Sequence, residues 1–179
     1  TVLYNGNGGA HSITGVNFQP DTVWVKRRNG ANNHNLFDAV RGTNALLPNA
    51  TNSELNRFFS SYDSDGFSFA AGGHADNNAS SGTYVAWNWL ASNTTATNSA
   101  GANGASIAST YSANTTSGFS IITWASPVSN GSTILHGLSS TPEVLICKSR
   151  SAAGAWGVFS PPILGSSYLY LYLTAAAYN

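Results

Sequence analysis

Two tryptophans alternate with smaller residues near the middle of this 179-residue chain. Trp87 and Trp89 belong to an apolar run at residues 84–90, and in a β-strand alternate side chains share one face. Flat aromatic rings on one face can stack against sugar rings, and neighbouring asparagines would supply hydrogen bonds. The same pattern also suits the packed core of a sandwich. Trp87, Trp89 and Trp124, which ends a later apolar run, are therefore candidate ligand-binding residues, with packing as the alternative.

Two basic residues lie in a strand-like run that also contains Trp24. In a strand, Lys26 and Arg28 would share one face with Trp24. The pattern recurs further along the chain, where Lys148 and Arg150 follow an apolar residue. Such cations commonly pair with carboxylates and cover the edge of a sheet. The functional alternative is a patch that grips a neighbouring subunit or an acidic glycan, which makes Lys26 and Arg28 candidate ligand-binding residues.

One acidic run resembles the start of a calcium loop. Asp63 and Asp65 offer oxygen ligands at alternate positions, and Gly66 supplies a turn. The later ligands and the closing glutamate are missing, so the two aspartates are weak candidates for Ca²⁺ and no metal site is predicted. A tight turn leading into a strand explains the same residues, because Asp and Gly favour turns.

No residue pattern predicts catalysis. The chain has 4 histidines, and no two of them have the spacing of metal ligands. It lacks the Gly-x-Ser-x-Gly elbow that presents a nucleophilic serine. With only 7 Asp and Glu residues, it offers few acids for a paired-carboxylate site. We therefore predict a protein that is not an enzyme and that holds no cofactor.

The charge content is low, at 8% of residues, and the formal net charge is zero. A neutral chain has no electrostatic footprint for nucleic acid and little attraction to an anionic membrane. No apolar run approaches the roughly 18 residues that a membrane-spanning helix needs. The single cysteine, Cys147, lies in an apolar run and is expected to be a buried, inert thiol. Neither nucleic acid nor a membrane is an expected partner.

Short β-type runs separated by Gly, Asn, Ser and Pro fill the chain. We expect strands at residues 2–4, 22–28, 66–70, 83–90, 118–124, 143–148, 156–160 and 168–173. The best helical signal is a capping-box pattern at residues 51–59, where Glu54 follows Thr51, and it predicts a turn or two of helix. The fold class is predicted to be all-β, a jelly-roll-like antiparallel β-sandwich.

The chain contains an incomplete internal repeat. Gly15, Pro20 and Lys26 stand in the same order and spacing as Gly137, Pro142 and Lys148. Repeat 1 is assigned to residues 1–117 and half repeat 2 to residues 118–179, with a Ser/Thr/Asn-rich loop or linker expected at residues 92–117. We expect one sandwich domain over residues 1–179, to which both copies contribute strands, within a longer protein.

Several motifs together carry a family resemblance. They are PDTVWVKRR at residues 20–28, LFDAVRG at 36–42, SYDSDGFSF at 61–69, GTYVAWNW at 82–89, GFSIITW at 118–124 and HGLSSTPEVLICKSR at 136–150. The chain resembles an uncharacterised domain family of tail-fibre-like and other structural proteins of marine bacteriophages. At residues 159–162, Phe-Ser-Pro-Pro departs from that pattern, and the two prolines limit strand pairing.

The resemblance implies a structural protein on the virion surface, in the extracellular particle. It would be a capsid decoration, a head fibre or a tail-appendage module that mediates assembly or host attachment. Its partners would be other virion proteins and copies of itself, with a trimer as the expected homo-oligomer. The alternative is a carbohydrate-binding receptor or adhesin module that grips host surface glycan. Exposure of Trp87, Trp89 or Trp124 in a groove would favour that alternative.

Overall fold

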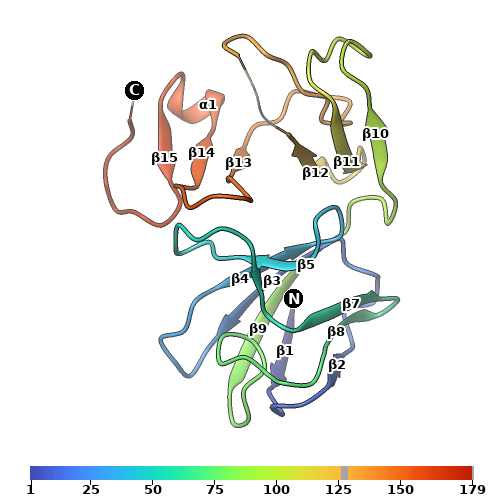
Figure 1. The fold of residues 1–179 in the computed structure, drawn as a ribbon, viewed down its shortest axis with the longest axis vertical. Helices are drawn as coiled ribbons and strands as arrows, with labels where there is room; N and C mark the ends of the chain where they lie inside the picture. The colour runs from blue at the N-terminus through green and yellow to red at the C-terminus, as the bar shows by residue number, and fades with distance from the viewer. Residues whose placement is uncertain (126–128, 179) are drawn as a thin grey trace.

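The computed structural model describes residues 1–125 and 129–178. The fold is nearly all β, with antiparallel sheets that are consistent with the predicted sandwich class. Each run predicted to be a strand overlaps one of the observed strands. Figure 1 shows two parts stacked along the long axis, which we call the first half (residues 1–91) and the second half (residues 92–178).

The first half is a sandwich of two antiparallel sheets. The larger sheet has the strand order β1-β9-β3-β4-β5-β6, and the smaller has the order β2-β8-β7. Strand β9 therefore lies between β1 and β3, although it comes last in this half of the chain. The strands are β1 (Val2–Asn5), β2 (His11–Ile13), β3 (Thr22–Arg27), β4 (Asn35–Asp38), β5 (Gly42–Leu46), β6 (Leu55–Asn56), β7 (Phe59–Asp63), β8 (Gly66–Phe69) and β9 (Thr83–Trp89).

The core of the first half lies between these two sheets. Val23, Val25 and Phe37 reach it from the larger sheet, and Phe67 and Phe69 reach it from the smaller one. All five are within 2% of complete burial. Burying a side chain of this size stabilises a fold by about 1.5–3 kcal/mol. Because side chains alternate along β3 and β9, filling this core leaves the odd-numbered tryptophans of β9 on the opposite face of the sheet.

The second half is made of two smaller sheets, ordered β10-β11-β12 and β13-β14-β15. Its described strands pair with one another and not with the sheets of the first half. A short helix, α1, follows β14 and begins with two prolines, which accounts for the end of that strand. The elements are β10 (Ala96–Asn98), β11 (Ser109–Asn114), β12 (Phe119–Trp124), β13 (Leu145–Cys147), β14 (Gly157–Phe159), α1 (Pro161–Leu164) and β15 (Tyr168–Tyr170).

Two local predictions were wrong. The stretch at residues 92–117, expected to be a loop or linker, contains β10 and β11. The segment at residues 51–59, expected to be helical, contains the short strand β6 and the start of β7. There Glu54 is bound by Arg41 and Arg150 instead of closing a capping box. Among the described residues, no helix has the length and apolar character needed to cross a bilayer.

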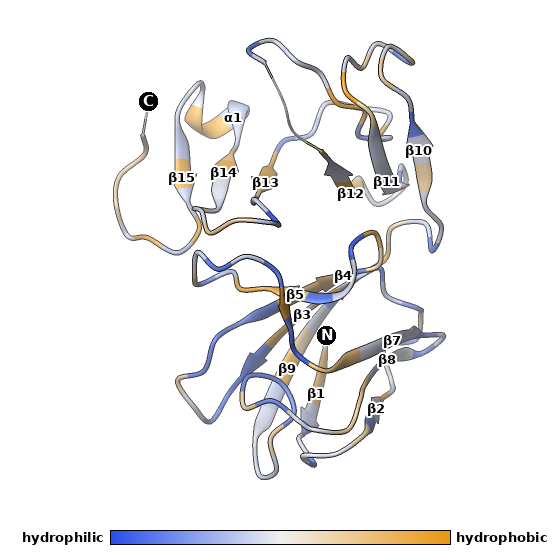
Figure 2. Cartoon of the chain, viewed as in Figure 1, coloured by the Kyte–Doolittle hydropathy of each residue, from blue (hydrophilic) through white to orange (hydrophobic). Residues whose placement is uncertain are grey.

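The two halves meet where the loop before β6 contacts the segment after β13. Trp156 is buried there, and its indole N–H donates to the carbonyls of Leu47 and Ala50 at 2.8 and 3.1 Å. Gly154 donates its N–H to the carbonyl of Thr51. Figure 2 shows that hydrophobic residues continue from this level into β13, β14 and β15. The contact between the halves thus includes a buried tryptophan that is held by hydrogen bonds to backbone carbonyls.

Candidate functional site

Three tryptophans gather on the outer face of the larger sheet. Trp24 of β3 is directly opposite Trp87 of β9, and their rings meet edge to face at 6.3 Å. Trp89 follows on the same face, two residues along β9. Together with His34 they line an open pocket of about 260 Å³. We call these four residues the tryptophan face.

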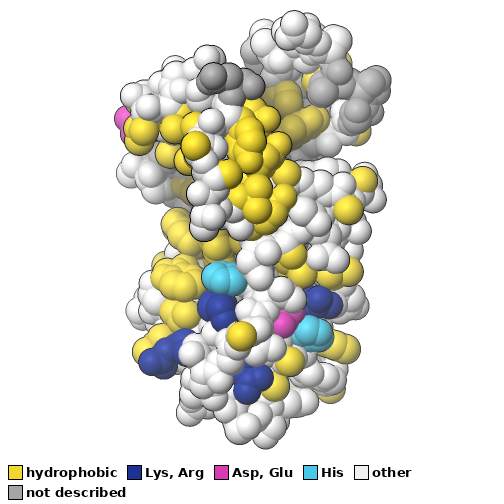
Figure 3. Space-filling model, turned by 90° about the vertical axis from the view of Figure 1, so that its left-hand side faces the viewer, with side chains coloured by type: hydrophobic (Ala, Val, Ile, Leu, Met, Phe, Trp, Pro, Cys, Tyr) yellow, Lys and Arg dark blue, Asp and Glu magenta, His cyan; other side chains and the backbone are white. Residues whose placement is uncertain are grey.

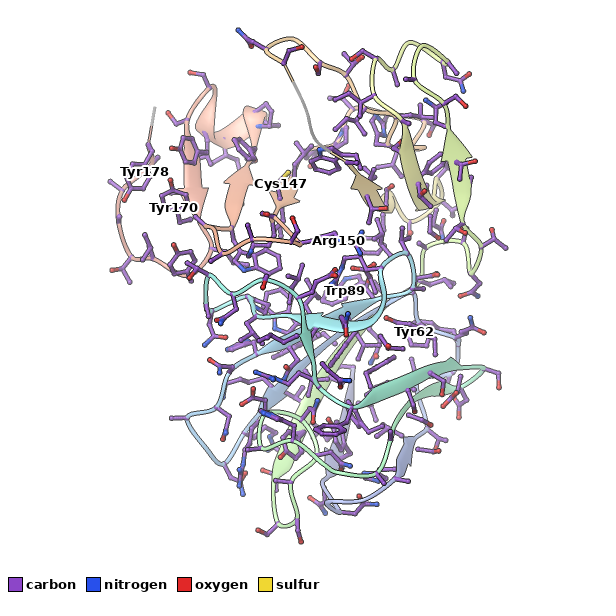
Figure 4. All side chains as sticks on the ribbon, in the orientation of Figure 1. Tyr62, Trp89, Cys147, Arg150, Tyr170 and Tyr178 are labelled. Carbon is purple, nitrogen blue, oxygen red and sulfur yellow. The ribbon has the colours of Figure 1, made fainter. Side chains whose placement is uncertain are left out.

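The tryptophan face is open to solvent. Trp87 and Trp89 are each 37% exposed, so neither belongs to the core. Trp89 also stacks on Phe119 of β12, with ring centroids 6.2 Å apart, which places it beside the second half. Figure 4 shows Trp89 at the level where the two halves meet. The prediction that Trp87 and Trp89 share a face is confirmed, whereas the packing alternative for them is not.

His34 fixes the orientation of Trp24. The indole N–H of Trp24 donates to Nδ1 of His34 at 3.0 Å. Burial, and then the positive charge of Lys26, lower the pKa of His34. The imidazole therefore favours the neutral form at pH 7, with Nδ1 as the acceptor and the proton on Nε2.

An asparagine-rich loop borders the tryptophan face. The backbone N–H of His34 donates to Oδ1 of Asn49 at 2.9 Å, and Nδ2 of Asn49 donates to Oδ1 of Asn33 at 3.0 Å. The two amide groups thus lie next to His34, which lines the pocket. A few polar groups around aromatic rings are the usual composition of a small-molecule site.

The predicted basic residues lie close to this face. Lys26 is half-buried, and its ammonium donates to the carbonyls of Arg27 and Gly30 at 2.7 and 3.0 Å. It therefore fastens the loop after β3, although its charge still acts on His34. Arg28 is exposed just beyond β3. Their assignment as ligand-binding residues stays a prediction.

Trp124 lies elsewhere, at the end of β12. It is 39% exposed and lines a second open pocket of about 480 Å³ with Thr97, Ser109 and Arg150. This pocket belongs to the sheet β10-β11-β12, whereas Trp87 and Trp89 lie on the larger sheet of the first half. The structure therefore brings Trp87 and Trp89 together and leaves Trp124 as a separate aromatic residue.

The two aspartates of the calcium-like run have protein partners. Asp63 accepts hydrogen bonds from the hydroxyls of Ser61 and Ser68 at 2.7 and 2.6 Å. Asp65 accepts from the backbone N–H groups of Gly15 and Asn17, and these bonds lower its pKa. Among the described residues, no three His, Cys, Asp or Glu side chains gather as a metal site would require. The turn interpretation accounts for both carboxylates.

Sequence reasoning missed Trp24 and His34 as parts of the site. The alternation in β3 already placed Trp24 on the face of Lys26. The alternation could not predict that β3 pairs with β9, and this pairing places Trp24 opposite Trp87. His34 comes from the loop before β4 and had no periodic signal at all.

A comparison with protein-family models assigns the chain to a family. A family model described as a domain of unknown function, DUF7483, matches residues 1–179. The chain belongs to the DUF7483 family. Neither a curated protein nor a solved structure matches it. The DUF7483 description names no activity, ligand or particle, so the function of the tryptophan face is argued from its geometry.

Proposed function

We propose that this domain binds carbohydrate at the tryptophan face and serves as an attachment module without enzymatic activity. The observation that carries the proposal is the open pocket formed by Trp24, Trp87, Trp89 and His34. The apolar faces of pyranose rings pack on exposed indoles. The Asn33–Asn49 pair and the imidazole of His34 supply donors and acceptors for the hydroxyl groups.

The low charge of the chain is compatible with a neutral ligand. With 7 basic and 7 acidic residues, contacts to a glycan would depend on stacking and neutral hydrogen bonds. Such contacts are screened little by salt, in contrast to exposed ion pairs. Binding should therefore persist at the ionic strength of seawater.

Glycan binding is tested by titrating a broad glycan panel while tryptophan fluorescence is recorded. Trp87→Ala should weaken the binding of any glycan hit about tenfold, because it removes one aromatic contact worth about 1.4 kcal/mol. Trp124→Ala is the matched control, since Trp124 is exposed to a similar extent but lies away from the pocket. No response across the panel, or equal losses in both variants, would reject the proposal.

A second candidate function is structural, within a bacteriophage particle. Here we propose a virion-surface protein: a capsid decoration, a head fibre or a tail appendage, associated with other virion proteins and with copies of itself as a trimer. The motif resemblance supports this setting. The apolar side chains exposed on the second half, such as Ile163 at 82%, favour an assembly role (Figure 3).

Immunogold electron microscopy of purified particles tests this setting. Label on heads or on tails would support it and would also locate the protein. Particles without label would reject it. Light scattering of the purified chain gives the oligomeric state, and a monomer at all accessible concentrations would contradict the trimer.

A further inference from the structure

Two indoles of the tryptophan face stand at a steep angle to each other. The ring planes of Trp24 and Trp87 are 76° apart, and their centroids are separated by 6.3 Å. The strand register fixes this contact, because Trp24 of β3 lies directly opposite Trp87 of β9. A pyranose ring that stacks on one of these indoles therefore cannot stack on the other. The pocket offers a sugar two aromatic walls at a corner, and not one flat platform.

Both walls are held by the surrounding structure. Strands β3 and β9 are inner strands of the larger sheet, and each pairs with a neighbour on both sides. The indole N–H of Trp24 donates to Nδ1 of His34 at 3.0 Å, and the two rings meet edge to face at 6.0 Å. A site on rigid strands keeps its shape, so it can discriminate between ligands that differ by a small group.

The two indoles differ in how accessible they are. Trp87 is 37% exposed, whereas Trp24 is half-buried. Trp87 is therefore the indole on which a whole sugar ring can stack. Because the ring of Trp24 is turned by 76° from that platform, it meets a substituent of the sugar and not the sugar ring.

The wall formed by Trp24 is chemically apolar. The indole N–H is the one polar group of its side chain, and it is already bonded to His34. A hydroxyl group placed against this ring would lose water without gaining a hydrogen bond from it. A methyl group there would instead remove apolar surface from water. The corner thus favours a sugar substituent that ends in a methyl group.

The charge around the pocket distinguishes a neutral methyl group from a methylated cation. Aromatic walls can bind quaternary ammonium groups as well as neutral ones. The residues that line this pocket are Trp24, His34, Trp87 and Trp89, and none of them is acidic. A positive charge lies nearby instead, since Lys26 contributes, after burial, to the lowered pKa of His34. This charge repels a cationic ligand.

On the basis of the carbohydrate function proposed above, on which this inference rests, we propose that the tryptophan face selects glycans whose sugars carry an uncharged methyl group. The pyranose ring stacks on Trp87, and the methyl group packs against Trp24. N-acetylated amino sugars and 6-deoxy sugars both present such a group.

The test compares sugars that differ only at this group, with the intact chain and with tryptophan fluorescence as the readout. Chitotriose has acetamido groups where cellotriose has hydroxyls. Methyl α-L-fucoside has a methyl group where methyl α-L-galactoside has a hydroxymethyl. In at least one pair the methyl-bearing sugar should bind about tenfold more tightly, as one well-placed methyl group does in a hydrophobic pocket. The pair that shows the preference identifies the source of the methyl group.

Substitutions separate the two walls. Trp24→Ala removes the surface that the methyl group contacts, so the ratio of the two affinities should fall close to one. Trp87→Ala removes the platform, so both affinities should fall about tenfold and their ratio should stay. Trp124→Ala is the matched control, because Trp124 lines a different pocket, and it should alter neither affinity. Circular dichroism checks that the variants fold, and the comparison of sugars in the unsubstituted chain does not depend on them.

Three results would overturn the inference while leaving the proposed function intact or redirecting it. Equal affinities within both pairs of sugars would mean a carbohydrate site without selectivity for a methyl group. Choline that binds more tightly than either methyl-bearing sugar would show that the corner takes a cation despite Lys26. A preference that persists in Trp24→Ala would place the methyl group elsewhere. No response to any sugar, by contrast, would reject the proposed carbohydrate function together with this inference.

Discussion

At the scale of single residues, the bond between Trp24 and His34 has a fixed direction. An indole N–H can only donate, so Nδ1 of His34 has to be the acceptor and cannot carry a proton. Burial first, and the charge of Lys26 second, lower the pKa of His34. A proton on Nδ1 and the bond to Trp24 therefore exclude each other.

Acidification should break this bond. Because the folded-state pKa is lowered, the stability that the bond contributes is present above the unfolded value of about 6.5 and is lost as the pH falls below it. The NMR signal of the Trp24 indole N–H should shift over that acidic range. The indole of Trp156 is the internal control, since its acceptors are backbone carbonyls that do not titrate. A shift centred above pH 6.5 would contradict the assignment.

Ion pairs of Glu54 connect the first half to the second half. Its carboxylate accepts from Arg150 at 2.7 Å and from Arg41 at 3.1 Å. Glu54→Gln should lower the free energy of unfolding by about 1–2 kcal/mol, because Arg41 is buried and loses one of its two acidic partners. Urea unfolding measures the change. Glu143→Gln is the matched control at an exposed site, and an equal loss there would show that no specific pair is involved.

The carboxylate of Glu54 should also make the stability of the fold sensitive to acid. Burial raises the pKa of Glu54, but the hydrogen bonds and charges of Arg150 and Arg41 outweigh it and leave the pKa below its ordinary value. The stability it contributes is therefore present above the unfolded pKa and lost as the pH falls through the lowered folded one. In Glu54→Gln, unfolding should depend less on pH in that range. An unchanged pH profile would contradict this role.

At the scale of elements, the pairing of β2 with β8 depends on one glycine. Gly66 has a φ of +156°, and a Cβ there would collide with the carbonyl of Ile13. Gly15 also has a positive φ, +88°, but a Cβ there would meet no atom within 4 Å.

Alanine at the two glycines should therefore have unequal effects. Gly15→Ala should cost about 1–2 kcal/mol of stability, because it adds only backbone strain. Gly66→Ala should cost more, because it also pushes β2 away from β8. Thermal unfolding of both variants measures the difference. Equal melting temperatures would mean that the collision is relieved without loss of pairing.

The sequence was most informative about elements with a strict period of two. Alternation in residues 83–90 placed Trp87 and Trp89 on one face, and the repeat matched β3 with β13. It was least informative where contacts are distant along the chain: the opposition of Trp24 and Trp87 depends on a pairing of β3 with β9. The helix expected at residues 51–59 failed for the same reason, because Arg150 engages Glu54 from the other half.

At the scale of the whole molecule, the two sequence repeats differ in how far their apolar side chains are buried. Among the described residues, the buried phenylalanines all belong to the first half, including Phe37, whereas its counterpart Phe159 is exposed. Backbone pairing between β13 and β14 is the same as between β3 and β4. Local stability should therefore follow side-chain burial more than backbone pairing.

Hydrogen exchange tests this difference. Amides of β13 and β14 should exchange at least about tenfold faster than the matching amides of β3 and β4. The strand pairs serve as controls for each other, because their registers agree. Equal protection would show that the second half is stabilised without the side-chain burial that the first half uses.

The position of β9 also governs when the chain can fold. Because this strand lies between β1 and β3, these two strands do not pair with each other. A ribosome that has released only residues 1–80 has therefore exposed two separated edges and an open core. Closure must wait until residues 83–89 emerge, and the long sequence separation between β1 and β9 makes that step slow. The nascent chain is most in need of chaperones during this interval.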